Sequence, residues 1–180
     1  MSLLFALRFD LRNPEFAGTD MADRYAAALD MAEWADDLGC VSIAISEHHA
    51  SPDGYLPSPF LMTAAMAART TNVRFAIAAL IAPFYDPIRL AEDAVVLDHL
   101  SRGRVDLVVG GGYVREEFAM YGVAMKERVA RVVEVVETLK GAFTGRPSGS
   151  RPEPHRTEPD RRARGGGGPR LGRDGTVLPA

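Results

Sequence analysis

Four short apolar runs alternate along this chain with longer segments in which apolar residues recur at helical spacing. The runs lie at residues 3–9, 41–46, 73–81 and 105–109. Strands that are separated by helices must each cross back over a helix before they pair, so they pair in parallel through right-handed crossovers. This alternation predicts the α/β fold class.

The helical segments carry boundary signals of their own. Thr19 or Asp20 can cap the first helix, and Ser58 can cap the second, with Pro59 in its first turn. Further helices are expected over about residues 86–100, near Glu116, and along an amphipathic stretch whose apolar side carries Val129, Val132, Val133, Val136 and Leu139.

Two architectures accommodate four such units: an open doubly wound sheet and a fragment of an eight-stranded barrel. A complete barrel takes about 250 residues, so the four units in residues 1–146 correspond to half of one. The run at 73–81 is almost continuously apolar, which is typical of a strand covered on both faces. Periodicity alone leaves both architectures open.

The composition changes abruptly after Arg146. Residues 147–180 contain seven Gly, six Pro and seven Arg, with no aromatic residue. Such a segment buries too little apolar surface to offset the entropy of ordering it, so we expect a disordered tail behind a folded domain at 1–146. Without aromatic side chains to stack on bases, an RNA-binding role is disfavoured. The break in composition favours a frameshift or a gene truncation as the origin of the tail.

The charge, the hydropathy and the cysteine count exclude several functional classes. The net charge is −3, which shows no nucleic-acid or anionic-membrane footprint. The longest strongly apolar stretch, residues 75–85, falls short of the ~20 residues that a membrane helix needs. Cys40 is the only cysteine and cannot form an internal disulfide, which fits a reducing cytoplasm.

The loops that follow the strands hold the candidate functional residues, because the carboxyl ends of parallel strands open on one face. Glu47, His48 and His49 follow the second run. Imidazoles suit proton transfer near neutral pH. Adjacent histidines on extended chain point to opposite sides, so a zinc site is disfavoured and no metal is expected. The alternative is that a histidine here only hydrogen-bonds a neighbouring loop.

Three consecutive glycines, Gly110, Gly111 and Gly112, follow the fourth run. Without Cβ atoms, their backbone can be approached closely by a flat or phosphorylated ligand. The run matches neither the dinucleotide-binding fingerprint nor a Walker loop, and a plain tight turn is the alternative. Arg128 is a candidate phosphate ligand, with a solvated surface charge as the alternative.

Ordered blocks of residues connect these candidate loops. They are Ser-Glu-His-His (46–49), Ala-Ala-Arg-Thr-Thr-Asn-Val-Arg (67–74), residues 86–104 from Asp-Pro-Ile-Arg to Ser-Arg-Gly-Arg, and residues 110–123 beginning Gly-Gly-Gly-Tyr. By their order and spacing, residues 1–146 resemble the bacterial luciferase-like monooxygenase family.

The resemblance implies the N-terminal half of a (β/α)8 TIM barrel. It also implies a reduced flavin at the barrel mouth, either FMN or the deazaflavin F420, and in the FMN enzymes dioxygen that oxidises a small organic substrate such as an aldehyde. Matched residue by residue, His48 is the implied catalytic base. Gly110, Gly111 and Gly112 would lie beside the flavin ring, and Arg128 would contact the flavin phosphate. A non-proline cis peptide near the flavin is frequent in the family.

The resemblance also sets expectations about assembly. The later barrel strands, whose loops complete the flavin-phosphate site in the family, are missing from this sequence, so we expect weak flavin binding. Open strand edges and an exposed apolar interior favour a homodimer or pairing with a complete homologue. The alternatives are a non-catalytic remnant or partner subunit, and a deazaflavin-dependent oxidoreductase.

Overall fold

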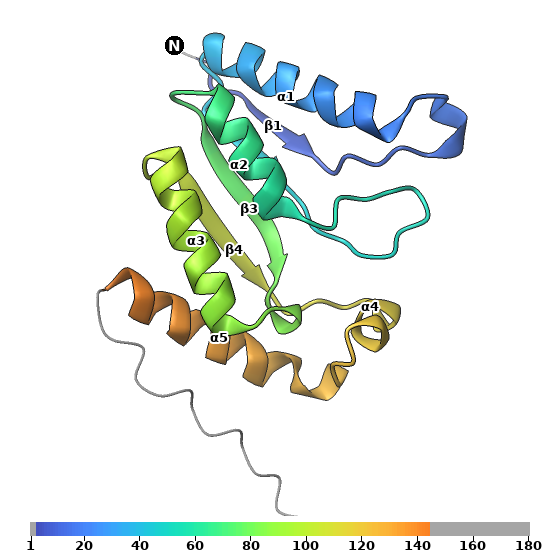
Figure 1. Cartoon of the computed structure of the whole chain (residues 1–180), viewed down its shortest axis with the longest axis vertical. Coiled ribbons are helices and arrows are strands. Elements are labelled where there is room, and N and C mark those ends of the chain that lie inside the picture. Colours follow the sequence, from blue (N-terminus) through green and yellow to red (C-terminus); the bar gives the residue numbers. More distant parts are fainter. Residues whose placement is uncertain (1–2, 145–180) are drawn as a thin grey trace, which may run out of the picture. The chain divides into compact units, whose positions relative to one another are not determined.

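The computed structural model describes residues 3–144, which contain a four-stranded sheet (Figure 1). Its strands are β1 (Ala6–Phe9), β2 (Ser42–Ile45), β3 (Arg74–Ile81) and β4 (Val105–Gly110), and they lie in that order. Every neighbouring pair is parallel, so the predicted α/β class is confirmed. The tail predicted at 147–180 lies outside the described residues.

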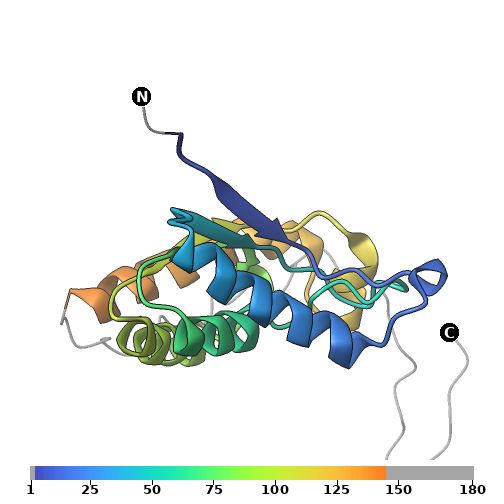
Figure 2. The same cartoon turned by 90° about the horizontal axis from the view of Figure 1, so that it is seen from above.

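Three helices connect one strand of this sheet to the next, and two more follow β4 within the described residues. They are α1 (Met21–Asp37), α2 (Pro59–Arg69), α3 (Pro87–Ser101), α4 (Arg115–Met120) and α5 (Arg128–Phe143). Figure 2 shows α1, α2 and α3 side by side on one face of the sheet, in the order of the strands. Each strand after β1 therefore enters the sheet after a helix has crossed the same face.

The helix starts follow from local capping. The carboxylate of Asp20 accepts a hydrogen bond from the Ala22 N–H, and that of Asp86 accepts from Ile88 and a further N–H of the first turn of α3. Ser58 occupies the cap position of α2 but makes no side-chain capping bond, so that part of the prediction is wrong. Proline at the first position, with its fixed φ, begins α2 in its place.

The two faces of the sheet differ in character. The helix-covered face buries large side chains, among them Ile43, Phe75 and Ile77. On the other face the strands present small or polar side chains, and Val108 in β4 is 49% exposed. The prediction that the run at 73–81 is covered on both faces is therefore wrong for the described part of the chain. Alanines make the run continuously apolar without requiring a second layer.

Helix α5 buries only part of the side that the sequence predicts. Val135 and Leu139 are buried, whereas Val129 and Val133 are 67% and 56% exposed. The helix packs on α3, and Val132 lies with Val135 and Leu139 in one core cluster that also contains Leu90 and Ala94 of α3. The buried side is therefore displaced toward one edge of the predicted apolar side, and its other edge is exposed.

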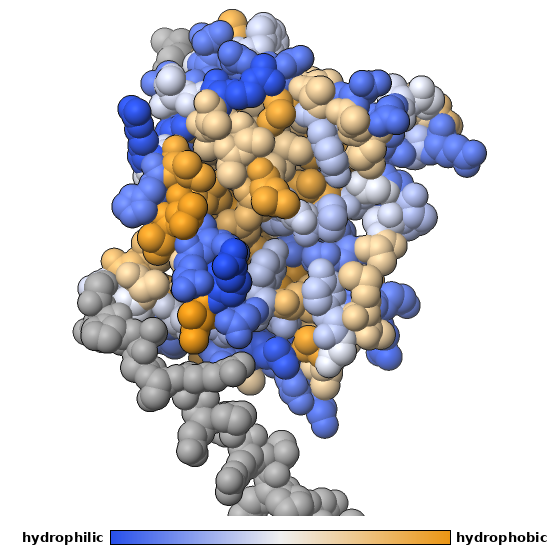
Figure 3. Space-filling model, viewed as in Figure 1, coloured by the Kyte–Doolittle hydropathy of each residue, from blue (hydrophilic) through white to orange (hydrophobic). Residues whose placement is uncertain are grey.

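Apolar side chains also gather on the outer surface of α2 and α3 (Figure 3). A cavity of about 410 Å³ lies there, and Leu61, Val96 and Leu100 are among its lining residues. Among residues 3–144, no helix combines the length and the hydrophobicity that crossing a membrane requires.

Candidate active site

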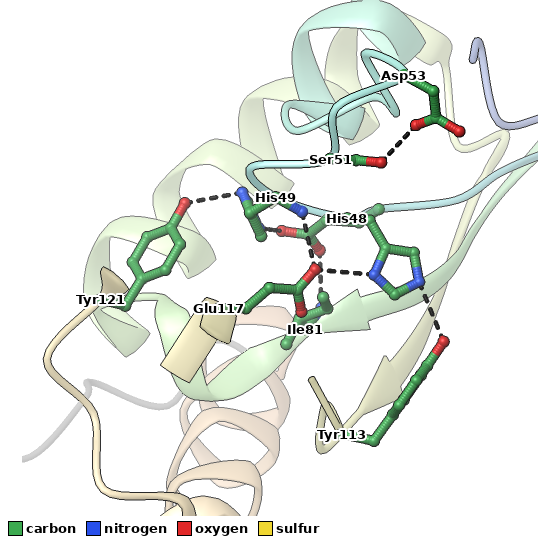
Figure 4. A network of polar contacts seen from close by, with 9 residues as sticks. His48, His49, Ser51, Asp53, Ile81, Tyr113, Glu117 and Tyr121 are labelled. Atoms are coloured by element: carbon green, nitrogen blue, oxygen red, sulfur yellow. Dashed lines mark hydrogen bonds and ion pairs between the residues drawn. The ribbon is translucent and has the colours of Figure 1, made fainter. Parts of the chain in front are cut away.

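The loops after β2 and β4 meet at the carboxyl end of the sheet (Figure 4). His48 lies just beyond β2, and its Nδ1 is 2.8 Å from a carboxylate oxygen of Glu117, the third residue of α4. The hydroxyl oxygen of Tyr113, in the loop after β4, is 3.4 Å from His48 Nε2. The parallel arrangement therefore brings the predicted histidine to the loop that begins with the predicted glycines.

His48 is held on three sides but is not sealed from solvent. Its side chain is 24% exposed. The ring packs edge-on against Tyr55 at 4.8 Å and against Tyr113 at 5.7 Å between ring centres. Glu117 contacts Nδ1, so Nε2 is the nitrogen that faces the exposed Tyr113 hydroxyl.

Glu117 is the main site residue that the sequence interpretation missed. Its side chain is only 3% exposed. Oε1 contacts His48 Nδ1 and also accepts a hydrogen bond from the His49 N–H at 2.9 Å. Oε2 is buried and, within the part of the chain that the structure describes, has no hydrogen-bond partner. The local signal was slight: an acid directly before the buried Phe118 in a six-residue helix.

His49 points to the opposite side of the segment, as the alternation predicts. Its Nε2 lies 2.9 Å from Glu47 Oε1, and its Nδ1 lies 2.9 Å from the Tyr121 hydroxyl. Glu47 also accepts hydrogen bonds from the Tyr85 hydroxyl and from the Ile81 N–H, both at 2.7 Å. His49 is therefore enclosed in a satisfied network, and the structural role considered for one of the two histidines fits it.

This network raises the pKa of both of its phenols. Burial, and then the nearby Glu47 carboxylate, hold the pKa of Tyr85 far above its ordinary value. Burial also raises the pKa of Tyr121, with smaller contributions from Glu47 and Glu117. Both phenols therefore stay neutral donors. They line the cavity on the helix side, which includes neither His48 nor the three glycines.

Two of the three glycines are required by close packing. A Cβ at Gly110 would lie 2.9 Å from the Cβ of Ala79. Gly112 has φ of +67°, and a Cβ there would lie 2.9 Å from a methyl group of Ile81. The peptide bond between Ala78 and Ala79, beside Gly110, is cis, and the resemblance implies such a bond near the flavin.

Gly111 and Arg128 lie beside each other. A Cβ at Gly111 would be 4.0 Å from Arg128 Cδ and 3.8 Å from a methyl group of Val132. Arg128 is the first residue of α5, it is exposed, and its guanidinium has no ion-pair partner within residues 3–144. A positive side chain without an ion-pair partner, next to a glycine, suits an anionic group.

The small residues here also suit a flat, largely apolar ring. Ala78 and Ala79 lie in the second half of β3, with Ala79 beside Gly110, and none of these residues projects a long side chain. A phosphorylated isoalloxazine needs such a surface together with a cation for its phosphate, and Arg128 is a cation near these small residues. The residues present therefore fit a flavin mononucleotide. No group of three or more His, Cys, Asp or Glu side chains in residues 3–144 is placed to hold a metal ion.

Solved structures share this fold. Monooxygenase RslO1 from Streptomyces bottropensis is 31% identical, with a TM-score of 0.71 over 77% of this chain and 42% of that one. The oxygenating constituent of 3,6-diketocamphane monooxygenase from Pseudomonas putida, solved in complex with FMN, is 28% identical. Its TM-score is 0.71 over 79% of this chain and 40% of that one.

Sequence relatives agree with the structures. The oxygenase component of the flavin-dependent trigonelline monooxygenase of Acinetobacter baylyi is 32% identical over 123 residues, which are 67% of this chain and 34% of that protein. This chain spans about a third of the length of the curated relatives it matches. The family model of luciferase-like monooxygenases matches residues 2–168, and the chain therefore belongs to the luciferase-like monooxygenase family.

Proposed function

We propose that this chain carries the flavin-facing rim of a monooxygenase that uses reduced FMN and dioxygen to oxidise a small organic substrate. The four βα units would form one half of an eight-stranded barrel. The observation that carries the proposal is His48: a partly exposed imidazole, held by a buried carboxylate, beside the triple-glycine loop. Membership of the family and the FMN complex of a 28% identical structure support the cofactor.

His48 would move the proton that the reaction requires. Its Nδ1 is occupied by Glu117, and its Nε2 is available toward the rim. A neutral imidazole with a free Nε2 accepts a proton, and the resulting imidazolium can return it. When bound, reduced FMN would supply the two electrons with which dioxygen delivers one oxygen atom to the substrate.

Gly111 and Arg128 would hold the cofactor. Gly111 has no side chain of its own, and the Arg128 side chain lies next to it and has no ion-pair partner among the described residues. Because the charge of FMN is on its phosphate, Arg128 would contribute to FMN affinity and not to the affinity for riboflavin, which lacks the phosphate.

Binding is tested by titrating the purified chain with FMN and with riboflavin, and recording the visible absorption. We expect Arg128→Ala to weaken FMN binding about tenfold or more and to leave riboflavin binding unchanged. Arg131→Ala, one turn along α5 and ion-paired with Glu127, is the matched control. Equal losses for the two ligands would remove Arg128 from the phosphate site.

Reaction type is tested with photoreduced FMN, ¹⁸O₂ and a panel of aldehydes, with product masses as the readout. Incorporation of one ¹⁸O atom supports the monooxygenase. Reduction of F420 by a substrate without oxygen incorporation would favour the deazaflavin alternative. Failure to bind either cofactor would favour the non-catalytic remnant or partner subunit.

The open edges of the sheet bear on how the chain assembles. Strands β1 and β4 lie at the two edges of the described sheet, and an open edge can pair with another chain. We therefore propose that the protein forms a homodimer or pairs with a homologue. Sedimentation velocity of the purified chain, alone and mixed with a full-length family member, tests this: a monomer in both samples would contradict it.

A further inference from the structure

We propose that Glu117 is a positioning residue that fixes which ring nitrogen of His48 carries the proton. The proposal rests on the proposed function, in which Nε2 of His48 exchanges a proton at the rim. Glu117 itself does not reach the exposed side of the ring. It acts through Nδ1, on the side of the imidazole that faces the protein.

The donors around Glu117 assign the proton. An ionised carboxylate has acceptors only, and Oε1 already accepts the hydrogen bond of the His49 backbone N–H, which can only donate. The contact of 2.8 Å between Oε1 and His48 Nδ1 therefore places a hydrogen on Nδ1. In the neutral ring, Nε2 is then left with its lone pair.

The position of Glu117 is itself firmly determined. The residue lies in α4, 69 positions away from His48 along the chain, and is enclosed between the loops after β2 and β4. Its side chain is 3% exposed and contacts two consecutive residues of the same segment. The imidazole thus meets a fixed acceptor on its buried side.

Few other groups compete for the ring. The titratable groups that face His48 are Glu117, the hydroxyl of Tyr113 at 3.4 Å from Nε2, and Tyr55, which meets the ring edge-on. Glu47 and Tyr121 contact His49 on the other side of the segment. Among the described residues that contact the ring, only Glu117 combines a carboxylate with burial, so its removal leaves Nδ1 without an acceptor from this part of the chain.

A purely structural role for Glu117 makes a different prediction. If Glu117 served only to join α4 to the segment after β2, its replacement would lower the stability and leave the tautomer of His48 unchanged. The tautomer is visible by NMR, because the two ring nitrogens of a neutral imidazole have separate ¹⁵N signals. The full chain contains four histidines, so the spectrum is simple, and His48→Gln assigns one set of signals.

The experiment uses full-length protein with ¹⁵N-labelled histidine, at a pH where the imidazoles are neutral. We expect Nδ1–H for His48 in the wild type and a shift to the Nε2–H form in Glu117→Ala. Oxygen transfer should fall about tenfold or more. Glu117→Gln, which keeps the size of the side chain, should shift the tautomer in part. Glu116→Gln, at the exposed neighbouring position, should change neither readout.

The outcomes distinguish a failure of the positioning role of Glu117 from a failure of the proposed role of His48. If the His48 signals in Glu117→Ala and Glu117→Gln stay those of the wild type while both proteins remain folded, the positioning role is wrong. An unchanged tautomer with reduced turnover would likewise overturn it. If the tautomer shifts and oxygen transfer does not fall, Glu117 positions His48 as proposed, and it is the role of His48 in the proposed function that fails.

Discussion

Both ends of the sheet contain charged side chains that are largely removed from solvent. The groups to which these side chains are hydrogen-bonded differ between the two ends. At the amino end, Asp36 and Arg104 bond mostly to backbone groups. At the carboxyl end, Glu47 and Glu117 each contact a histidine side chain as well as one backbone N–H, and Glu117 keeps one buried oxygen without a partner in the described residues. The first end ties the chain together, and the second leaves groups available for chemistry.

The hydrogen bonds of Asp36 and Arg104 join several elements at the amino end of the sheet. The Asp36 carboxylate accepts hydrogen bonds from the N–H groups of three consecutive residues before β3, two of them at 2.6 Å. Burial raises the pKa of Asp36, but the hydrogen bonds outweigh it and hold the pKa below its ordinary value. Arg104 donates to four backbone carbonyls, those of Ala67, Thr70, Val73 and Ser101. These contacts join α1, α2 and α3 to the strand entrances.

The largest expected effect is therefore on stability at the amino end. Asp36→Ala removes the acceptor of three backbone N–H groups and should lower the free energy of unfolding by about 3 kcal/mol. Urea unfolding measures the loss. Asp37→Ala, at the exposed next position, should stay within about 0.5 kcal/mol. Similar losses of unfolding free energy in the two variants would contradict the structural role of Asp36 at the amino end.

The next effect is on activity at the carboxyl end. His48→Ala should lower oxygen transfer about 10²-fold, equivalent to about 2.7 kcal/mol of activation free energy, because the proton acceptor is lost. Its unfolding midpoint should stay close to that of the wild type. His99→Ala, on the exposed side of α3, is the control for a lost imidazole. Turnover that survives in His48→Ala would remove this residue from the mechanism.

A smaller effect on stability distinguishes the contacts of Glu47 from those of His48 at the carboxyl end. Tyr85→Phe removes the 2.7 Å hydrogen bond to Glu47 and should cost about 1.5 kcal/mol of unfolding free energy. Tyr113→Phe, at an exposed position with a long 3.4 Å contact, should cost less than about 0.5 kcal/mol. Equal costs would show that both tyrosines serve the fold alike.

The smallest effect is a change in pH dependence. Because the pKa of Asp36 is lowered on folding, the unfolded chain binds this proton more readily. The stabilisation is complete above the ordinary pKa of about 4 and is lost as the pH falls through the lower folded value. Asp36→Asn should remove that part of the slope, at most about 1.4 kcal/mol per pH unit. Unfolding curves between about pH 5 and about pH 2 compare the two proteins; parallel slopes would contradict the assignment.

Local patterns predicted most of the fold. Strand runs, the Asp20 cap and the opposite orientation of His48 and His49 depend on a few neighbouring residues each. Glu117 could not be assigned as the partner of His48, because the contact spans 69 positions and depends on how α4 folds back. The buried side of α5 was predicted in part: Leu139 is buried as expected, but tertiary contacts with α3 bury Val135 and leave Val129 and Val133 exposed.

The orientation of the two histidines makes the length of their segment as important as its composition. Neighbouring residues on extended chain face opposite ways, so one additional residue before His48 would turn its ring toward the Tyr85 network and send another side chain to the rim. Replacements at 46–49 can be compensated one at a time, whereas an insertion or deletion there disrupts both carboxylate contacts at once. Sequence variation among functional versions of this loop should therefore consist of substitutions at constant length.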